Sequence, residues 1–323
     1  MPTRTVWHHP DMKTALSLIR FALHGGAGEL PRDAGPQDAQ RTALRDIAAE
    51  ALALLQAGGS ALDAVSLAVE RLEQCPLFNA GIGAVLNRDG LPELDAAIAR
   101  GEDRGTGAVA GVSRVASPIR LARAVMEQTP HALFTADGAE RVARDLGLPM
   151  VEPESFVIPL RLEQLAAAKR SGSIALDHVD DDAAFGTVGA VARDVHGHLA
   201  AATSTGGLTN KLPGRIGDTA VFGAGTFADD QSCAISCTGT GESFIRSVFG
   251  QAVHGRMVWG GLSLDAACKD ALDDVRRLGG TGGCIAIDRD GSISLPFNAG
   301  VLYRAWASAD GVVQVAIRRD DAA

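Results

Sequence analysis

The sequence has no run of basic residues and no long apolar stretch. Its 39 acidic residues outnumber its 30 basic residues, which gives a formal net charge of −9. Proteins that bind nucleic acids gather Lys and Arg along the phosphates, so this balance argues against nucleic acid as a partner. No apolar run approaches the roughly 20 residues of a membrane-spanning helix, so we expect no association with a membrane.

Cysteines and aromatic residues are also scarce. The five cysteines form no C-x-x-C pair, and an odd number in a chain of this length is typical of reduced thiols, which predicts a cytoplasmic protein. Aromatic residues make up 4% of the chain, whereas apolar residues make up 46% and glycine supplies 38 residues. We therefore expect a sizeable core built from Ala, Val and Leu, with close approach of backbones.

Helices are predicted where apolar residues recur at spacings of three and four. Gly58 and Gly59 end the first of them, and Ser60 can cap the second through its side-chain oxygen. The predicted helices cover residues 37–58, 60–72, 118–126, 136–146, 161–169, 241–257 and 262–278.

Strands are predicted mainly in hairpins, where short apolar runs flank turn residues. One hairpin pairs 84–86 with 94–98 about the turn Asn87–Gly90, and a second pairs 187–193 with 198–204. A third hairpin spans 283–295, with Asp290 and Gly291 at its turn. Further strands are predicted at 18–23, 107–112 and 234–238.

This order of elements indicates an α+β protein. Helices come in clusters and strands in hairpins, which argues against the alternation of strand and helix that builds a parallel sheet. Two antiparallel sheets between layers of helices fit the order better. The segment 171–184 is polar and has neither helical nor strand periodicity, so we predict a mobile linker within a single domain.

The step Gly186-Thr187-Val188-Gly189 follows this linker and opens a predicted strand. A threonine at a new N-terminus would carry a hydroxyl nucleophile and an amine base on one residue, and a free α-amine has a pKa of about 7.7–8.0. Glycine before it tolerates the strained backbone that self-cleavage needs. Taken alone, the short string also fits an ordinary strand start.

Two later segments have matching chemistry. Arg215 and Asp218 lie three residues apart on a glycine-rich loop, and together they could hold the carboxylate and the ammonium of an α-amino acid, although a surface ion pair is the commoner outcome. Thr238-Gly239-Thr240-Gly241 follows an apolar strand. Its hydroxyl and backbone N–H groups could stabilise an oxyanion, and a glycine-rich turn could also hold phosphate, but neither phosphate-binding glycine motif accompanies it.

In this order, these segments resemble those of the plant-type L-asparaginase/isoaspartyl aminopeptidase family of N-terminal-nucleophile (Ntn) hydrolases. The resemblance runs from His24-Gly25-Gly26-Ala27-Gly28 to about Trp306. It implies a four-layer αββα sandwich. It also implies that the chain cuts itself after Gly186, giving an α subunit of residues 1–186, with a mobile linker at about 160–186, and a β subunit of residues 187–323.

The resemblance also assigns roles to individual residues. It makes Thr187 the nucleophile and base, and it places the Thr205 hydroxyl against it. His24 receives a structural role. The remaining assignments are the oxyanion hole to Thr238 and Gly239, a substrate contact to Gly241, the substrate carboxylate to Arg215, its ammonium to Asp218, and an approach to the nucleophile to Asn79.

The substrates implied are L-asparagine and β-aspartyl dipeptides, hydrolysed through a β-aspartyl ester without a catalytic cofactor. The family also implies a homodimer of cleaved protomers and a structural sodium ion. Backbone oxygens would bind that ion at Leu72, Glu73, Cys75, Phe78, Ala80 and Ile82. Two alternatives are a glycosylasparaginase-like amidohydrolase and the threonine aspartase of this superfamily, but both of these carry Asp where this chain has Gly186. A third alternative is an uncleaved protein that binds amino acids without catalysis.

Overall fold

A computed structural model of the chain describes residues 16, 18–31, 34–171 and 186–321. The linker predicted at 171–184 lies outside these residues, apart from Ser171, which ends helix α6 (Pro159–Ser171). Within the described part of the chain, no helix combines the length and the apolar character that crossing a membrane requires.

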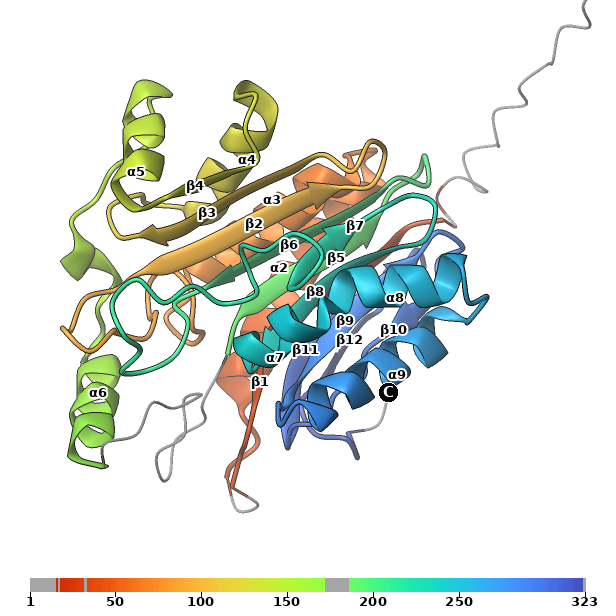
Figure 1. Cartoon of the computed structure of the whole chain (residues 1–323). Coiled ribbons are helices and arrows are strands. Elements are labelled where there is room, and N and C mark those ends of the chain that lie inside the picture. Colours follow the sequence, from red (N-terminus) through yellow and green to blue (C-terminus); the bar gives the residue numbers. More distant parts are fainter. Residues whose placement is uncertain (1–15, 17, 32–33, 172–185, 322–323) are drawn as a thin grey trace, which may run out of the picture.

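Two β-sheets lie face to face at the centre of the molecule (Figure 1). The larger sheet holds β1 (Arg20–Gly28), β2 (Leu94–Arg100), β3 (Thr106–Val112), β4 (Leu133–Thr135), β5 (Val188–Arg193), β6 (Leu199–Thr205), β11 (Val301–Ser308) and β12 (Val313–Ala316), in the order β12-β11-β1-β5-β6-β2-β3-β4. The smaller sheet holds β7 (Thr226–Ala228), β8 (Cys233–Gly239), β9 (Gly282–Asp288) and β10 (Ile293–Ser294), in the order β10-β9-β8-β7.

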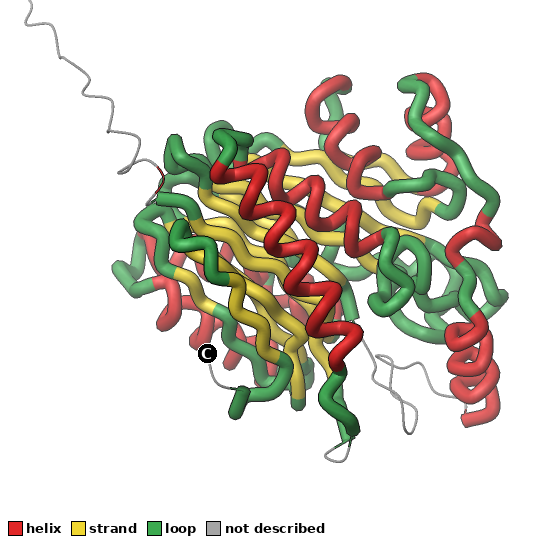
Figure 2. The backbone as a smooth tube through the Cα atoms, turned by 180° about the vertical axis from the view of Figure 1, so that it is seen from behind, coloured by secondary structure: helices red, strands yellow, loops and turns green. Residues whose placement is uncertain are grey.

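Helices cover the outer face of each sheet. Figure 2 shows the two long helices lying across the larger sheet, and helices α7 to α9 cover the smaller one in Figure 1. The helices on the larger sheet are α2 (Asp38–Gln56), α3 (Ala61–Glu73), α4 (Pro118–Gln128) and α5 (Ala136–Asp145), and those on the smaller sheet are α7 (Gly241–Ser247), α8 (Phe249–Val258) and α9 (Leu264–Arg277). A short 3-10 helix spans Pro153–Phe156.

Apolar side chains fill all three spaces between the four layers. Leu44, Val65 and Phe21 belong to the cluster between α2, α3 and the larger sheet, and Phe249 and Cys268 belong to the cluster beneath α8 and α9. The cluster between the sheets consists largely of small or branched residues, which lets the sheets approach closely. Its buried members are Ala22, Ala99, Val191, Leu199, Ala201, Ala228, Ala234, Ile285 and Ile287. The predicted α+β class and the αββα sandwich are confirmed.

One predicted hairpin is wrong. The turn at Asn87 forms, with Asn87 N donating to Leu91 O at 2.9 Å, but the residues before it contribute only an isolated bridge between Leu86 and Pro92. Strand β2 instead pairs with β3 on one side and with β6 on the other. Two long neighbouring strands satisfy more backbone groups than a three-residue partner can, so the distant pairing prevails over the local turn signal.

The single helix predicted at 241–257 is also wrong. Val248 lies between α7 and α8 with a left-handed backbone (φ 47°), which breaks the helix into two. A β-branched residue at positive φ is unfavourable, and no sequence pattern signals it here. The prediction also omitted β4, β7, β11 and β12, whereas the hairpin formed by β5 and β6 is confirmed.

The larger sheet interleaves strands from both sides of Gly186. Strand β1 pairs with β11 and β5, and strand β2 pairs with β6. Residues before and after the predicted cleavage point therefore share one sheet and one core. Thr187 immediately precedes β5, in the middle of this sheet.

Candidate active site

The Thr187 side chain is fixed by the strand that pairs with β5. Val188 and Ser204 are register partners, which brings Thr187 beside Thr205. The Thr187 hydroxyl donates to Thr205 Oγ1 at 3.1 Å, and the same oxygen accepts the backbone N–H of Gly207 at 2.9 Å. Because a β-branched side chain has few χ1 rotamers, this contact holds the Thr187 hydroxyl in one direction.

Gly186 lies in a space where a larger residue would crowd its neighbours. A Cβ built on it would lie 2.8 Å from Thr238 Oγ1, and a Cβ on Gly26 would lie 2.5 Å from the Gly186 nitrogen. Thr238 Oγ1 accepts the backbone N–H of Ala27 at 3.1 Å, and it donates to no described residue. The Gly186–Thr187 peptide therefore lies against a buried hydroxyl whose proton can still be donated.

The segment after Thr238 depends on glycine. Gly239 has φ 142°, and a Cβ there would overlap the carbonyl oxygen of Thr281. A Cβ on Gly241 would lie 2.9 Å from both Arg215 Nη2 and Asp218 Oδ1. Gly241 thus brings the backbone against both residues that are predicted to hold a substrate head group.

Asp218 is buried and only partly satisfied. It is 4% exposed, and its Oδ2 atom has no hydrogen-bond partner among the residues that the structure describes. Burial raises the pKa of Asp218 to about 7, and the attraction of Arg215 opposes this rise. A buried acceptor without a partner is costly, so this oxygen is suited to a cationic or hydrogen-bond-donating ligand.

Arg215 forms a bidentate ion pair that the sequence analysis did not predict. Its Nε and Nη2 atoms donate to the two carboxylate oxygens of Glu242, at 2.8 Å each. This occupies the side edge of the guanidinium and leaves its end edge unpaired among the described residues. Among the described residues, Arg215 does not form the local ion pair with Asp218 that was the alternative to a head-group site.

A narrow pocket brings most of the predicted residues together. Asn79 does not line it. Its side-chain amide donates to Gly207 O and accepts from Val85 N, at 2.9 Å each, so it supports the loop beside Thr205 and does not itself reach Thr187. The pocket is lined by Gly186, Thr187, Thr205, Gly207, Leu208, Arg215, Gly217, Asp218 and Gly239.

Two buried charged residues beneath this pocket were not predicted. Asp95 is the register partner of Thr205, and its carboxylate accepts the N–H groups of Gly111 at 2.9 Å and Gly217 at 3.4 Å. Lys211, also buried, donates to Glu93 O at 2.7 Å. They anchor the loop that carries Asp218. The only sequence signal for either residue was the presence of a charged residue, Asp95, inside the apolar strand 94–98.

His24 lies behind the nucleophile in a polar chain. Its Nε2 atom is 2.9 Å from Ser236 Oγ, which is 2.8 Å from Thr203 Oγ1. Burial lowers the pKa of His24 to about 3, so the ring is neutral at physiological pH. A Cβ on Gly189 would overlap Ser236 Oγ and lie 2.6 Å from His24 Nε2, so the glycine of β5 makes room for this chain.

The loop after α3 is closed by backbone hydrogen bonds. Glu73 O accepts Ile82 N at 2.7 Å, and a Cβ on Gly83 would lie 2.7 Å from Pro76 O and 3.1 Å from Phe78 O. Of the carbonyls predicted to bind sodium, Phe78 O thus lies near Gly83 and Glu73 O already accepts a hydrogen bond, and carbonyl oxygens as a class suit a hard cation. The described residues contain no cluster of three or more His, Cys, Asp or Glu side chains that could hold a metal.

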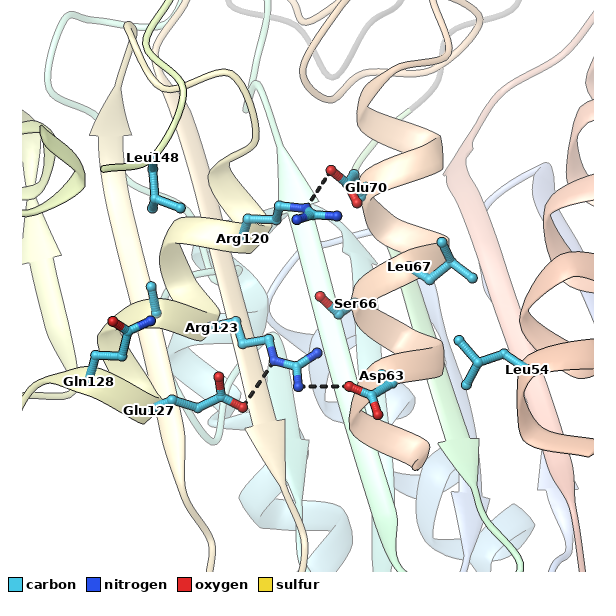
Figure 3. A pocket seen from close by; sticks show the side chains of 11 residues that line it. Leu54, Asp63, Ser66, Leu67, Glu70, Arg120, Arg123, Glu127, Gln128 and Leu148 are labelled. Carbon is cyan, nitrogen blue, oxygen red and sulfur yellow. Dashed lines mark hydrogen bonds and ion pairs between the residues drawn. The ribbon is translucent and has the colours of Figure 1, made fainter. Parts of the chain in front are cut away.

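A second pocket lies between α3 and α4, on the outer helix layer (Figure 3). Its charged side chains pair with one another. Arg120 reaches Glu70 at 2.5 Å, and Arg123 contacts Asp63 at 2.7 Å and Glu127 at 3.0 Å. Each of these five charged side chains therefore has an oppositely charged neighbour, which contrasts with the site at Thr187.

Comparisons with known proteins agree with this geometry. Residues 17–317 match the family described as asparaginase. The isoaspartyl peptidases of Salmonella typhimurium and Escherichia coli are each 49% identical to this chain over 308 residues, which cover 93% of it and 98% and 96% of those proteins. The isoaspartyl peptidase/L-asparaginase of Mus musculus is 40% identical over 298 residues, 90% of each chain. The chain therefore belongs to the asparaginase family of amidohydrolases, as the order of its threonine and glycine segments predicts.

Proposed function

We propose that this protein hydrolyses L-asparagine and β-aspartyl dipeptides, after cutting its own chain between Gly186 and Thr187. The observation that carries the proposal is one pocket with three features. A threonine hydroxyl is held by Thr205, an unpaired guanidinium edge comes from Arg215, and an unpaired carboxylate oxygen comes from Asp218. The relatives named isoaspartyl peptidase and isoaspartyl peptidase/L-asparaginase support it.

In the proposed self-cleavage, Thr187 Oγ1 attacks the carbonyl carbon of Gly186. The C–N bond between the two residues breaks, the nitrogen takes up a proton, and an ester links Gly186 to the threonine oxygen. Water then hydrolyses the ester. The Thr238 hydroxyl, which lies against Gly186, would donate to the oxygen that becomes negative during the attack.

In the proposed substrate reaction, the new amine of Thr187 takes the proton of its own hydroxyl. The hydroxyl oxygen attacks the side-chain amide carbon of the substrate, while Thr238 and the N–H of Gly239 stabilise the oxyanion. Ammonia or an amino acid leaves with a proton, and water releases L-aspartate from the β-aspartyl ester. The end edge of Arg215 would hold the α-carboxylate bidentately, and Asp218 would hold the α-ammonium.

A sodium ion would have a supporting role only. Backbone oxygens, which suit a hard cation, would hold it at Leu72, Glu73, Cys75, Phe78, Ala80 and Ile82. The ion would stabilise the loop that includes Asn79. Because Asn79 contacts Gly207, that loop supports the pocket wall beside Thr205.

We further propose that the cleaved chain remains one Ntn-hydrolase domain, residues 1–323, and works in the cytoplasm as a homodimer of cleaved protomers. The interleaving of β1 and β2 with β5, β6 and β11 supports retention of both fragments. Separating them would expose backbone donors and acceptors together with apolar surface.

The test is hydrolysis by matured protein of L-asparagine, of a β-aspartyl dipeptide, and of asparagine with its α-amine acylated. We expect activity on the first two and little on the third, because an acylated amine carries no positive charge for Asp218. Equal rates on the free and acylated substrates would contradict the head-group assignment. Hydrolysis of none of them would reject the proposed function.

A further inference from the structure

Arg215 and Asp218 carry opposite charges at the edge of one pocket, yet they do not pair. A Cβ on Gly241 would lie 2.9 Å from Arg215 Nη2 and 2.9 Å from Asp218 Oδ1, so both atoms border the same point. Within the described part of the chain, the Oδ2 atom of Asp218 nevertheless has no hydrogen-bond partner. A site for a zwitterionic head group needs this separation, because two groups that neutralise each other have little affinity left for a ligand.

Glu242 is the group that holds Arg215 in place. It takes the Nε and Nη2 donors at 2.8 Å each, and this bidentate geometry restricts the guanidinium to one orientation. Arg215 has five N–H donors, so the two Nη1 donors and one on Nη2 remain. A Cβ on Gly217 would lie 3.0 Å from Nη1, and one on Gly207 would lie 3.3 Å away. Both glycines line the pocket, so the remaining donors lie at its wall.

The ion pair sits at the pocket's solvent side. The Glu242 side chain is 53% exposed and the Arg215 side chain 16%. The Arg215 guanidinium holds the pKa of Glu242 below its usual range, so Glu242 remains ionised. Without Glu242, the carboxylates that attract Arg215 are those of Asp218 and Asp95, and Asp218 has the unpaired oxygen.

We propose that Glu242 is a positioning residue that sets the specificity for a free α-amino acid head, because it keeps Arg215 away from Asp218. This inference rests on the proposed function and deepens it. Removing Glu242 lets Arg215 pair with Asp218, so that the carboxylate subsite and the ammonium subsite neutralise each other. The nucleophile is untouched, so the loss falls on binding of the head group.

The test compares Glu242→Ala and Glu242→Gln with wild type, using only protein shown to be cleaved after Gly186. The matched control is Glu50→Ala. Glu50 forms the same bidentate pair with Arg71, at 2.8 and 3.0 Å, on the outer helix layer. We expect Glu242→Ala to raise KM for L-asparagine about tenfold, the upper range for ordering one rotamer-rich side chain on binding, with kcat within about twofold. Glu242→Gln, which retains one acceptor, should recover part of the loss.

Two substrates separate this role from a general structural one. A β-aspartyl dipeptide has the same head group, so its KM should rise by the same factor. Asparagine amide, whose α-carboxylate is replaced by a carboxamide, can use only the ammonium subsite, so Glu242→Ala should raise its KM by a smaller factor than it raises the KM of asparagine.

An equal loss on asparagine and on asparagine amide, a fall confined to kcat, or kinetics identical to those of Glu50→Ala would overturn the role of Glu242. Each of these outcomes leaves the proposed function standing. Only a wild-type protein that hydrolyses neither asparagine nor the dipeptide would remove both.

Discussion

Replacing Asp218 with Asn should weaken activity and raise stability, with a stability gain that depends on pH. The carboxylate is buried, and its Oδ2 atom lacks a hydrogen-bond partner in residues 18–31, 34–171 and 186–321. This suits an incoming ammonium, but it makes the ionised carboxylate unfavourable while the site is empty. Its pKa of about 7 lies above the ordinary value of 3.8. A raised carboxyl pKa makes the folded protein bind more protons than the unfolded chain between these values, so stability falls as the pH rises through this window.

The size of the effect follows from the shift. The penalty from Asp218 is about 2 kcal/mol at pH 5 and about 4 kcal/mol at pH 8, as order-of-magnitude values from 1.36 kcal/mol per pKa unit. The neutral amide of the Asp218→Asn variant carries no such penalty. The stability gained by the substitution should therefore be larger at pH 8 than at pH 5 by about 2 to 3 kcal/mol.

The assay is thermal unfolding of the Asp218→Asn variant against its parent at both pH values. Thr187→Ala should be present in both chains, so that neither is cleaved and fragment dissociation does not complicate the transition. Burial also raises the pKa of Glu73 to about 7, but Glu73 titrates in both proteins and cancels in the comparison. A gain that is the same at pH 5 and pH 8 would refute the reasoning, as would a loss of stability at pH 8.

Three further predictions concern the nucleophile and the assembly. Thr205→Val should lower kcat by roughly 10- to 100-fold, because it removes the acceptor of the Thr187 hydroxyl. It also leaves the Gly207 N–H without its acceptor, and a lost hydrogen bond of this kind costs about 1–3 kcal/mol. Unchanged steady-state kinetics of the cleaved variant would contradict this prediction. Gly186→Ala should slow self-cleavage, since its Cβ would press on Thr238 Oγ1. A time course on denaturing gels measures the cleavage rate, and a rate equal to that of wild type would contradict this steric effect. Light scattering of cleaved protein should give about twice the 33.3 kDa chain mass, and a mass near that of one chain would exclude the dimer.

The sequence predicts the parts of the fold that local signals determine. The β5–β6 hairpin follows from two apolar runs about a glycine turn, and α3 follows from its spacing and from Ser60, whose hydroxyl does accept Asp63 N at 3.1 Å. The pairing of β2 could not be predicted in this way. Its partner β6 lies about a hundred residues further along the chain, and only the assembled sheet decides between that strand and a nearer one.

The candidate site also combines residues that local motifs predict with residues that only distant contacts define. Thr187, Thr205 and Arg215 stand in short motifs whose order reveals the family. Asp95 and Glu242 could not be predicted, because their partners Gly217 and Arg215 lie 122 and 27 positions away. The spacing of Arg215 and Asp218 did not show that the two side chains stay apart, since two opposite charges three residues apart more often form a local ion pair.

The central claim is that Thr187 becomes an N-terminal nucleophile. The most direct measurement is the intact mass of purified, denatured protein, combined with activity on L-asparagine for the same sample. We expect two fragments, one beginning at Thr187, with activity rising as they accumulate, and a single inactive chain for Thr187→Ala. A fully active protein that remains one uncut chain would contradict it.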